Sequence, residues 1–408
     1  MKLLIITPFY APDLGPSAPL FTLLSSGLVK LGHQVTVIAA APHYPSGLVQ
    51  PQFRKMGIRQ SVENGVKVIR VPVPSLDRTN FKNRFLQFLC FQIGATWASI
   101  SQKFDVALIT NPAIETWLPF AWQAIFQRKP IIYSVFDVYP DVGIKLGIFR
   151  NQLVIKAVAL LERFCLKRAA AVQIISDSFR PGLHALGVPD SQMELIYIWV
   201  DTHLIQPLAR GNAFAREQEL THKFVVLYAG NIGLSQGLEH VLSAAELLAS
   251  HEDLRFVFVG DGSGCERLQS QAKQRGLSNI QFIPFQPRAR LPEVLASANV
   301  SLVILRRGIG SDSLPSKTFS ILASGRPMIA SVDEETELWN LVKGADAGLC
   351  IGPDDPEKLA KAILTLKQDA ALCERLGHNG RIRAEHHHSV ESAAEQFEKL
   401  FLKAILSH

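Results

Sequence analysis

Short apolar runs recur along the chain, and each is followed by a polar or glycine-containing loop and then by a segment with helical spacing of its apolar residues. Continuous apolar runs of this length are typical of strands that are buried on both faces of a parallel sheet. The alternation of strands and helices predicts an α/β protein with doubly wound parallel sheets. The predicted strands are 3–7, 34–40, 65–73, 105–110, 130–135, 172–176, 194–200, 224–230, 255–260, 279–284 and 300–305.

The pattern weakens between residues 204 and 222, where the sequence becomes polar and charged and contains proline and glycine. Such a stretch is typical of a domain boundary, and 408 residues are enough for two or three domains. We expect one Rossmann-like domain over residues 1–203 and a second over 204–385. The remaining segment, 386–408, contains an amphipathic helix that we expect to pack back toward the first domain. Its three adjacent histidines, 386–388, are interpreted as a solvated turn rather than a metal site.

The segment 308–331 combines a polar loop, a short helix and a new strand. Pro315 suits the first helical turn, where its missing N–H costs nothing, and a glycine and a proline end the helix again. Ser316 and Lys317 at the helix start suit a phosphate or diphosphate, and Ser320 shares a helix face with Ser316. The alternative is an ordinary capped helix whose serines only satisfy backbone groups.

The net charge of +6 permits nucleic acid, anionic membranes or phosphorylated substrates as partners. Nucleic acid is the least favoured, because the sequence contains no zinc finger, basic reading helix or ribonucleoprotein motif. The five cysteines have neither a disulfide pattern nor zinc-like spacing, so we expect a reducing compartment and no metal site. The first apolar segment is too short for the core of a signal peptide, which favours a cytoplasmic location.

The loop after the first predicted strand has a single glycine, Gly15, followed by Pro16. It therefore lacks the glycine fingerprint of dinucleotide-binding proteins, and we expect no NAD or FAD there. The loop can still line a substrate site.

Residues 81–100 form a strongly apolar segment that begins with two cations and carries five aromatic residues. Its glutamines and threonine make a bilayer-spanning helix improbable, because spanning needs about 20 apolar residues. Two interpretations stay open: a helix that lies in the membrane interface, possible as a peripheral contact, and a buried helix packed on the sheet.

Several motifs, in this order and spacing, resemble the retaining glycosyltransferases of family 4. The matching segments are the loop before Pro16, Gly32 to Ile38, Ser176 with its following helix, Val200-Asp201, Tyr228 to Gly233, Val259 to Gly262 and Leu314 to Pro327. More narrowly, Phe136 to Pro140, Tyr228 to Gly237 and Leu314 to Lys317 resemble the subgroup that builds bacterial surface polysaccharides, including O-antigen and colanic acid types. The resemblance covers both domains and implies the GT-B fold, in which two facing Rossmann-like domains enclose a cleft.

The resemblance also implies roles for individual residues. The family's two glutamates, eight positions apart, bracket the donor, and Asp312 and Ser320 stand at these positions. Asn231 and Gln236 stand where the family often has arginine and lysine, so Lys317 and Arg306 or Arg307 must supply the counter-charge of the diphosphate. Gly230 and Gly233 would let backbone amides approach the phosphates, and backbone near Phe285 would contact the base.

On the acceptor side the resemblance assigns Gly15 and Pro16, and Asp137 ends a strand where related enzymes place a polar or acidic group facing the sugar. Helix capping is the alternative for Asp137. With few acids present, the departing phosphate would take the acceptor's proton in a front-face reaction. No Asp-x-Asp motif is present, so we expect a metal-independent reaction that needs no cofactor beyond its nucleotide-sugar substrate.

The expected activity is transfer of a sugar from a nucleotide-diphosphate sugar, UDP-linked in preference to GDP-linked, to a lipid-linked or oligosaccharide acceptor at the inner face of the cell membrane. Two alternatives stay open. One is a non-catalytic partner protein of the same fold, suggested by Ser320, Asn231 and Gln236, and the other is a sugar-nucleotide epimerase of the GT-B fold.

Overall fold

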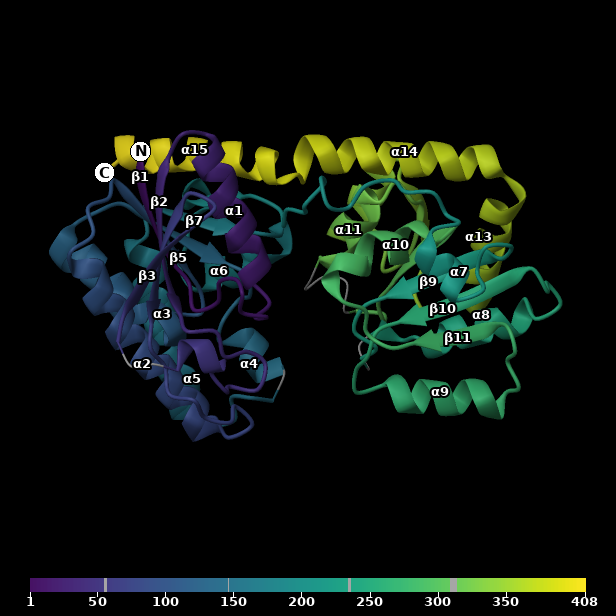
Figure 1. The fold of residues 1–408 in the computed structure, drawn as a ribbon, viewed down its shortest axis with the longest axis horizontal. Helices are drawn as coiled ribbons and strands as arrows, with labels where there is room; N and C mark the ends of the chain where they lie inside the picture. Colours follow the sequence, from purple (N-terminus) through teal and green to yellow (C-terminus); the bar gives the residue numbers. More distant parts are fainter. Residues whose placement is uncertain (55–56, 146, 234–235, 309–313) are drawn as a thin grey trace. The chain divides into compact units, whose positions relative to one another are not determined.

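The computed structural model describes residues 1–54, 57–145, 147–233, 236–308 and 314–408, and these divide into two compact units (Figure 1). The first unit comprises Met1–Tyr197 together with Val390–His408, and the second comprises Ile198–Ser389. Each unit is built around its own sheet.

The first unit contains a sheet of eight strands in the order β3-β4-β2-β1-β5-β6-β7-β8. Every neighbouring pair is parallel except β3 and β4, which are antiparallel. The strands are β1 (Lys2–Ile6), β2 (Gln34–Ala40), β3 (Arg59–Glu63), β4 (Val66–Val71), β5 (Val106–Thr110), β6 (Ile131–Val135), β7 (Ala171–Ile174) and β8 (Met193–Leu195). All five residues of β5 and of β6 are buried, as expected for strands covered on both faces.

The helices of this unit are α1 (Ala18–Lys30), α2 (Phe81–Ile100), α3 (Ala113–Trp122), α4 (Asp141–Lys145), α5 (Gln152–Arg168), α6 (Arg180–Ala185) and α15 (Val390–Leu406). A π-helical turn, η2 (Gln123–Gln127), continues α3, and short 3-10 turns lie at Pro51–Phe53, Asp177–Phe179 and Asp190–Gln192. Asn80 caps α2 and Asn151 caps α5 through their side-chain oxygens.

The C-terminal helix α15 packs on α1 in the first unit (Figure 1). The contact is close, since a Cβ at Gly27 of α1 would lie 3.1 Å from the Cβ of Ala394. An ion pair of 3.0 Å between His33 and Glu398 lies beside this contact. The last segment of the chain thus completes the fold formed by the first half.

The second unit contains six parallel strands in the order β11-β10-β9-β12-β13-β14. The strands are β9 (Phe224–Ala229), β10 (Leu254–Val259), β11 (Ile280–Ile283), β12 (Val300–Ile304), β13 (Met328–Ser331) and β14 (Gly348–Ile351). The helices are α7 (Ala213–Glu217), α8 (Glu239–Leu247), α9 (Cys265–Gln274), α10 (Leu291–Ala296), α11 (Lys317–Ala323), α12 (Glu337–Gly344), α13 (Pro356–Gln368) and α14 (Ala370–His387), with a 3-10 turn at Arg288–Arg290. Its core joins apolar residues of α8, α9 and α13 to those of the central strands. Both units are therefore mixed α/β with Rossmann-like parallel sheets, as the sequence predicts.

The predicted solvated turn at residues 386–388 is wrong. Helix α14 continues through His387, and His388 is buried with its ring 4.6 Å from that of Phe319. Burial lowers the pKa of His388 to about 3. Among the described residues no group of three or more histidines, cysteines or acids is placed to hold a metal ion.

Two glycine-containing loops of the second unit pack against each other at the carboxyl ends of β9 and β10. Gly260 has a φ of +146°, and a Cβ there would collide with the carbonyl oxygen of Gly230. Gly262 has a φ of +155° and is as tightly enclosed by Asn231 and Ile232. These backbone conformations are nearly restricted to glycine.

We expect Gly260→Ala to lower the free energy of unfolding by about 3 kcal/mol or more, because it adds a steric collision to a strained φ. Gly276 is the matched control: its φ is +67°, and an added Cβ would meet nothing within 4 Å. Gly276→Ala should cost only about 1 kcal/mol. Urea denaturation of both variants measures the difference, and equal losses would contradict the steric account.

Candidate active site

The candidate donor side of the molecule lies at the carboxyl edge of the second sheet. Because all six strands are parallel, the loops after β9, β10, β12 and β13 meet at this edge. These loops contain Gly230 to Gly233, Gly260 to Gly264, Leu305 to Gly308 and Val332 to Asp333. The edge therefore gathers most of the predicted donor-binding residues.

Lys317 is the first residue of α11 and lies at this edge of the sheet. Its Nζ lies 3.7 Å from the centre of the Tyr228 ring, and Tyr228 donates a hydrogen bond of 2.7 Å from its hydroxyl to the carbonyl of Asn231. Desolvation lowers the pKa of Lys317 to about 7. The ammonium has no ion-pair partner among the described residues, so its one favourable electrostatic contact there is the ring face.

Gly230 is required by this lysine. Its φ is +136°, and a Cβ would lie 3.1 Å from Nζ of Lys317. Its backbone N–H donates to the carbonyl of Val259 at 2.9 Å and is thus used within the loop cluster. In this structure Gly230 makes space for a cation and does not offer its own amide to a phosphate.

Asn231 and Gln236 both lie beside Gly233. The side-chain oxygen of Gln236 accepts a hydrogen bond of 2.9 Å from the N–H of Gly233. A Cβ at Gly233 would lie 2.8 Å from that oxygen and 3.0 Å from the amide nitrogen of Asn231. A phosphate approaching the Gly233 amide must therefore displace the Gln236 side chain.

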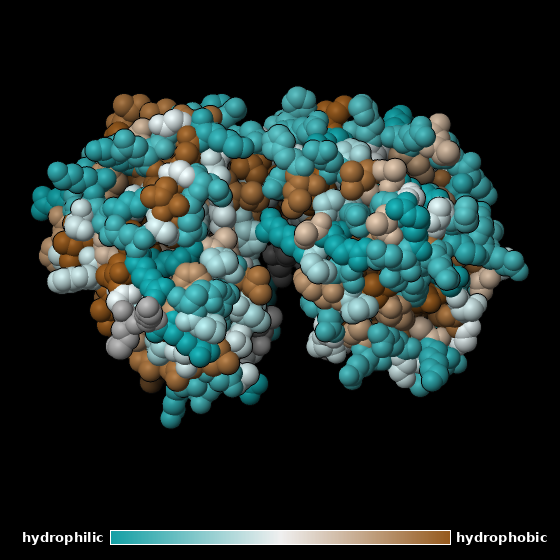
Figure 2. Space-filling view, in the orientation of Figure 1, coloured by the Kyte–Doolittle hydropathy of each residue, from teal (hydrophilic) through white to brown (hydrophobic). Residues whose placement is uncertain are grey.

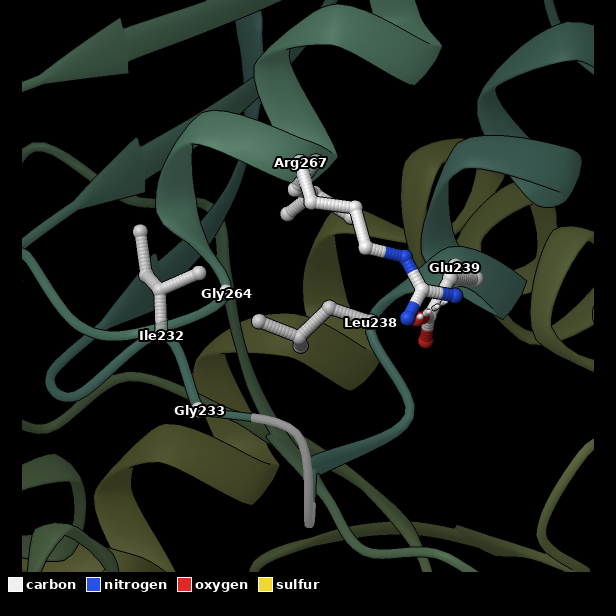
Figure 3. A pocket seen from close by; sticks show the side chains of 7 residues that line it. Ile232, Gly233, Leu238, Glu239, Gly264 and Arg267 are labelled. Atoms are coloured by element: carbon white, nitrogen blue, oxygen red, sulfur yellow. Dashed lines mark ion pairs between the residues drawn. The ribbon is translucent and has the colours of Figure 1, made fainter.

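Arg306 is less free than the sequence suggests. Its Nη2 lies 3.2 Å from Glu239, and Glu239 also pairs with Arg267 at 3.3 Å. Figure 3 shows the second pair at the rim of a small pocket lined by the backbone of Gly233 and Gly264 and the side chains of Ile232 and Leu238. The neighbouring Arg307 donates to the carbonyl of Pro353 at 3.4 Å. Both arginines of this loop thus already have protein partners.

The remaining donor-side residues lie on neighbouring elements. Phe285 follows β11 and is 74% exposed, so its ring face is open to a planar ligand. Ser316 is exposed just before α11, and Ser320 is half-buried one turn into that helix. Ser316 does not cap α11 with its side chain, which argues against the ordinary capped helix. Asp312 lies outside the described residues.

Asp137 follows β6 at the carboxyl edge of the first sheet. Its carboxyl accepts no hydrogen bond from the described residues, and α4 begins only at Asp141, so Asp137 does not cap this helix. Although the side chain reaches solvent, neighbouring groups desolvate it and raise its pKa to about 6. Asn111 fixes the backbone here by donating to the carbonyl of Asp137 and accepting from the N–H of Phe136.

The loop that follows β1 packs on aromatic side chains at the same edge of the sheet. A Cβ at Gly15 would collide with the ring of Phe9, while Pro16 next to it is exposed. The ring of Phe9 stacks on His43 with centroids 5.7 Å apart. Asp13 holds the loop to the end of β2, because its carboxylate accepts from the N–H groups of Gly15 and His43, each at 2.8 Å.

Sequence reasoning missed four polar residues of the first unit: His43, Arg78, Arg84 and Glu115. They follow three different strands and come together only when the sheet forms. Arg78 donates to Nε2 of His43 at 3.1 Å, and Glu115 is buried with both arginines near its carboxyl. The sequence signal that could have found these residues is a polar residue or arginine soon after each predicted strand.

Comparisons with known proteins identify the class from the fold. A sucrose-phosphate synthase from Thermosynechococcus elongatus has a TM-score of 0.76 at 18% identity, covering all of both chains. The Anabaena protein Alr3699/HepE, solved in complex with UDP-glucose, has a TM-score of 0.68 at 15% identity, covering 98% of this chain and 99% of its own. The protein has the GT-B fold of glycosyltransferases.

Two family models make the assignment narrower. The model described as "Glycosyl transferases group 1" matches residues 210–383, and the model described as "Glycosyl transferase 4-like domain" matches residues 18–199. The chain belongs to the family-4 glycosyltransferases. It is 28% identical over 373 residues to WcaI of Escherichia coli (strain K12), a glycosyl transferase named for colanic acid biosynthesis, covering 89% of this chain and 91% of WcaI. The resemblance to the surface-polysaccharide subgroup agrees with this similarity.

The low pKa of Lys317 can be measured directly. In protein whose lysines carry ¹³C-methyl groups from reductive methylation, we expect one signal to titrate near pH 7, whereas ordinary lysines titrate near about 10.4. The Lys317→Met variant should lack this signal. A Lys317 signal that titrates near pH 10 would show that its ammonium is not desolvated.

Proposed function

We propose that the protein is a retaining, metal-independent glycosyltransferase that moves a sugar from a nucleotide-diphosphate sugar, UDP-linked in preference to GDP-linked, to a lipid-linked acceptor in surface-polysaccharide biosynthesis. The observation that carries the donor side is the desolvated Lys317 above Tyr228 at a glycine-lined edge of the sheet. A diphosphate leaving group gains negative charge as its bond to the sugar breaks, and a fixed cation lowers that barrier. The similarity to WcaI and the UDP-glucose bound by Alr3699/HepE support the substrate class.

The reaction we propose needs no carboxylate nucleophile. The leaving phosphate, held by Lys317, accepts the proton of the acceptor hydroxyl on the face from which it departs. Asp137 orients the sugar or the acceptor hydroxyl. A pKa raised to about 6 leaves this carboxyl mostly ionised at neutral pH, so it accepts a hydrogen bond rather than donating one.

Calorimetric titration of UDP, GDP and ADP, with and without Mg²⁺, tests the donor site. We expect UDP to bind equally well without Mg²⁺ and to bind about tenfold or more weakly to Lys317→Met, because a hydrogen-bonded charge is lost. Bound diphosphate should also raise the pKa of Lys317, so binding at pH 8 should take up a proton. Buffers of different ionisation enthalpy reveal that uptake.

The outcomes of this titration separate the alternatives. Binding of no nucleotide would favour the non-catalytic partner protein. Binding of UDP-sugar followed by epimerisation without any acceptor would favour the epimerase. Binding that requires Mg²⁺ would contradict metal independence.

We further propose that α2 places the first unit on an anionic membrane surface. No described helix is long and apolar enough to cross a membrane. One face of α2 packs on β2, β4 and α3 through residues such as Phe91 and Ala95. The opposite face exposes a continuous apolar row, here named the α2 stripe: Phe81, Phe85, Leu86, Leu89, Ile93, Trp97 and Ile100. Figure 2 shows hydrophobic residues at the surface of this unit.

Charge supports an anionic surface. Lys82 is exposed beside the start of the α2 stripe, and Lys103 is exposed just after its end. Gln127 donates to the carbonyl of Ile100, which brings the exposed Arg128 to the same end. Apolar side chains flanked by cations are typical of helices that lie in a membrane interface.

We expect the double variant Ile93→Ser, Trp97→Ser to bind phosphatidylglycerol vesicles about tenfold or more weakly, because these side chains are 56% and 71% exposed and available for burial in lipid. Leu247→Ser is the control, since Leu247 is 55% exposed on α8 of the second unit. Cosedimentation measures the partition. An unchanged partition of a folded double variant would exclude α2 as the contact.

A further inference from the structure

Two arginines lie together at the carboxyl edge of the first sheet. The guanidinium of Arg78 lies over the rings of Phe9, Tyr44 and Phe88, between 5.5 and 5.6 Å from their centres. Arg84 belongs to the first turn of α2 and lies over the ring of Phe81 at 5.9 Å. Aromatic faces thus hold Arg78 in one place.

The contact between Arg78 and His43 fixes the charge of this histidine. Nη1 of Arg78 can only donate, so Nε2 of His43 accepts. The proton of His43 is then on Nδ1, which donates to the carbonyl of Ala41 at 2.9 Å. His43 is therefore neutral, and desolvation correspondingly lowers its pKa. It orients Arg78 without adding or cancelling charge.

The N–H groups of the Arg84 guanidinium have no hydrogen-bond acceptor among the described residues. Its guanidinium forms no hydrogen bond or ion pair with the described residues, and its Nε is buried without a partner. A buried donor left unpaired costs about 1–3 kcal/mol, and more when it is charged. The guanidinium is thus prepared for an anionic ligand.

Nearby acidic side chains do not fully neutralise Arg78 and Arg84. Glu115 belongs to the first turn of α3 and is buried, but neither arginine forms an ion pair with it in the described part of the chain. Burial raises the pKa of Glu115 to about 7, so its carboxyl is only partly ionised at neutral pH. The carboxylate of Asp13 accepts from backbone N–H groups, lies 3.6 Å from Nδ1 of His43 and offsets only part of the charge of the two arginines. The cluster keeps a net positive charge.

An apolar surface begins where the arginine pair lies. Phe81 and Phe85 of the α2 stripe flank Arg84 in the sequence, and the stripe continues to Ile100. A helix of 20 residues extends about 30 Å. An anion site that opens onto an apolar row of this length fits an amphiphile better than a free ion.

The same edge contains the candidate acceptor-side carboxyl. Burial raises the pKa of Tyr139, and the charges of Glu115, Asp137 and Arg84 lie close enough to shift it as well. Arg84 and Asp137 thus both lie near the Tyr139 side chain. A sugar attached to an anion held by the arginines would remain at the edge that contains Asp137.

We propose that Arg78 and Arg84 bind the phosphate or diphosphate of a lipid-linked acceptor whose hydrocarbon chain lies along the α2 stripe. This inference rests on the proposed function for the acceptor class. Paired guanidinium groups are well suited to phosphate oxygens, because each presents several fixed donors. The anion would also satisfy the unpaired Nε of Arg84.

Calorimetry with farnesyl diphosphate, inorganic pyrophosphate and farnesol as probes tests the site. All titrations use the Lys317→Met background, so that the donor-side lysine does not contribute. Farnesyl diphosphate should bind at least tenfold more tightly than either of the other probes. Arg84→Gln should weaken its binding about tenfold, and Arg84→Lys should restore part of that loss.

Lys82→Gln is the matched control, because Lys82 is an exposed cation in the same turn of α2. It should change the affinity less than twofold, and circular dichroism verifies that each variant is folded. Equal effects of Lys82→Gln and Arg84→Gln would indicate only general attraction of anions or of a charged lipid surface. Equal affinity for pyrophosphate and farnesyl diphosphate would indicate a free-anion site. Either result overturns the proposal.

Parallel titrations of UDP into Arg84→Gln with Lys317 intact keep the two hypotheses apart. UDP should bind this variant as it binds the unchanged protein. Failure of UDP to bind either form would refute the proposed donor site. The farnesyl diphosphate titrations would still test the acceptor site. Loss of UDP binding in Arg84→Gln alone would show that the arginine does not act in an acceptor site.

Discussion

The proposed donor site of the second unit depends on one desolvated ammonium. Lys317 lies on the face of Tyr228, and this arrangement requires a glycine at position 230, whose loop in turn requires Gly260 beside it. A desolvated cation that has no anionic partner among the described residues loses affinity for its proton, which is why the pKa of Lys317 is low. A diphosphate would supply the missing negative charge. In the proposed donor complex, the charge of Lys317 would therefore be more stable than in the free protein.

The fold could be predicted because its signals are local. Runs such as 34–40 and 224–230 are apolar without interruption, and strands buried on both faces of a parallel sheet require this pattern. The helix at 81–100 was also recognised, and its packing against the sheet is confirmed, while the membrane-interface interpretation stays a prediction. Phe91 packs inward as in a buried helix, while Trp97 is 71% exposed. Periodicity shows that a helix has two faces and does not show what covers the second.

The site could be predicted only in part, because side-chain partners come from distant segments. Lys317 was recognised from its place at the start of a helix, but its contact with Tyr228 joins α11 to β9. The contacts of Arg78 had no local signal, since its partners Phe9 and His43 follow β1 and β2. His388 was misjudged for the same reason: three adjacent histidines look polar, and the ring of Phe319 that covers the third lies far away in the sequence.

The charge balance of the second unit bears on the proposed donor site, where the resemblance leads us to expect a basic pair. Asn231 and Gln236 stand where the resemblance leads us to expect cations, and Arg306 shares the carboxylate of Glu239 with Arg267, so its charge is partly compensated. Arg307 donates to a backbone carbonyl. Among the described residues of these loops, Arg307 and Lys317 both lack an ionic partner, but Arg307 already donates a hydrogen bond and Lys317 contacts only the ring of Tyr228. Because an unpaired charge gains more from a diphosphate than one that must first leave a carboxylate, the binding energy for the phosphates should be concentrated on this lysine.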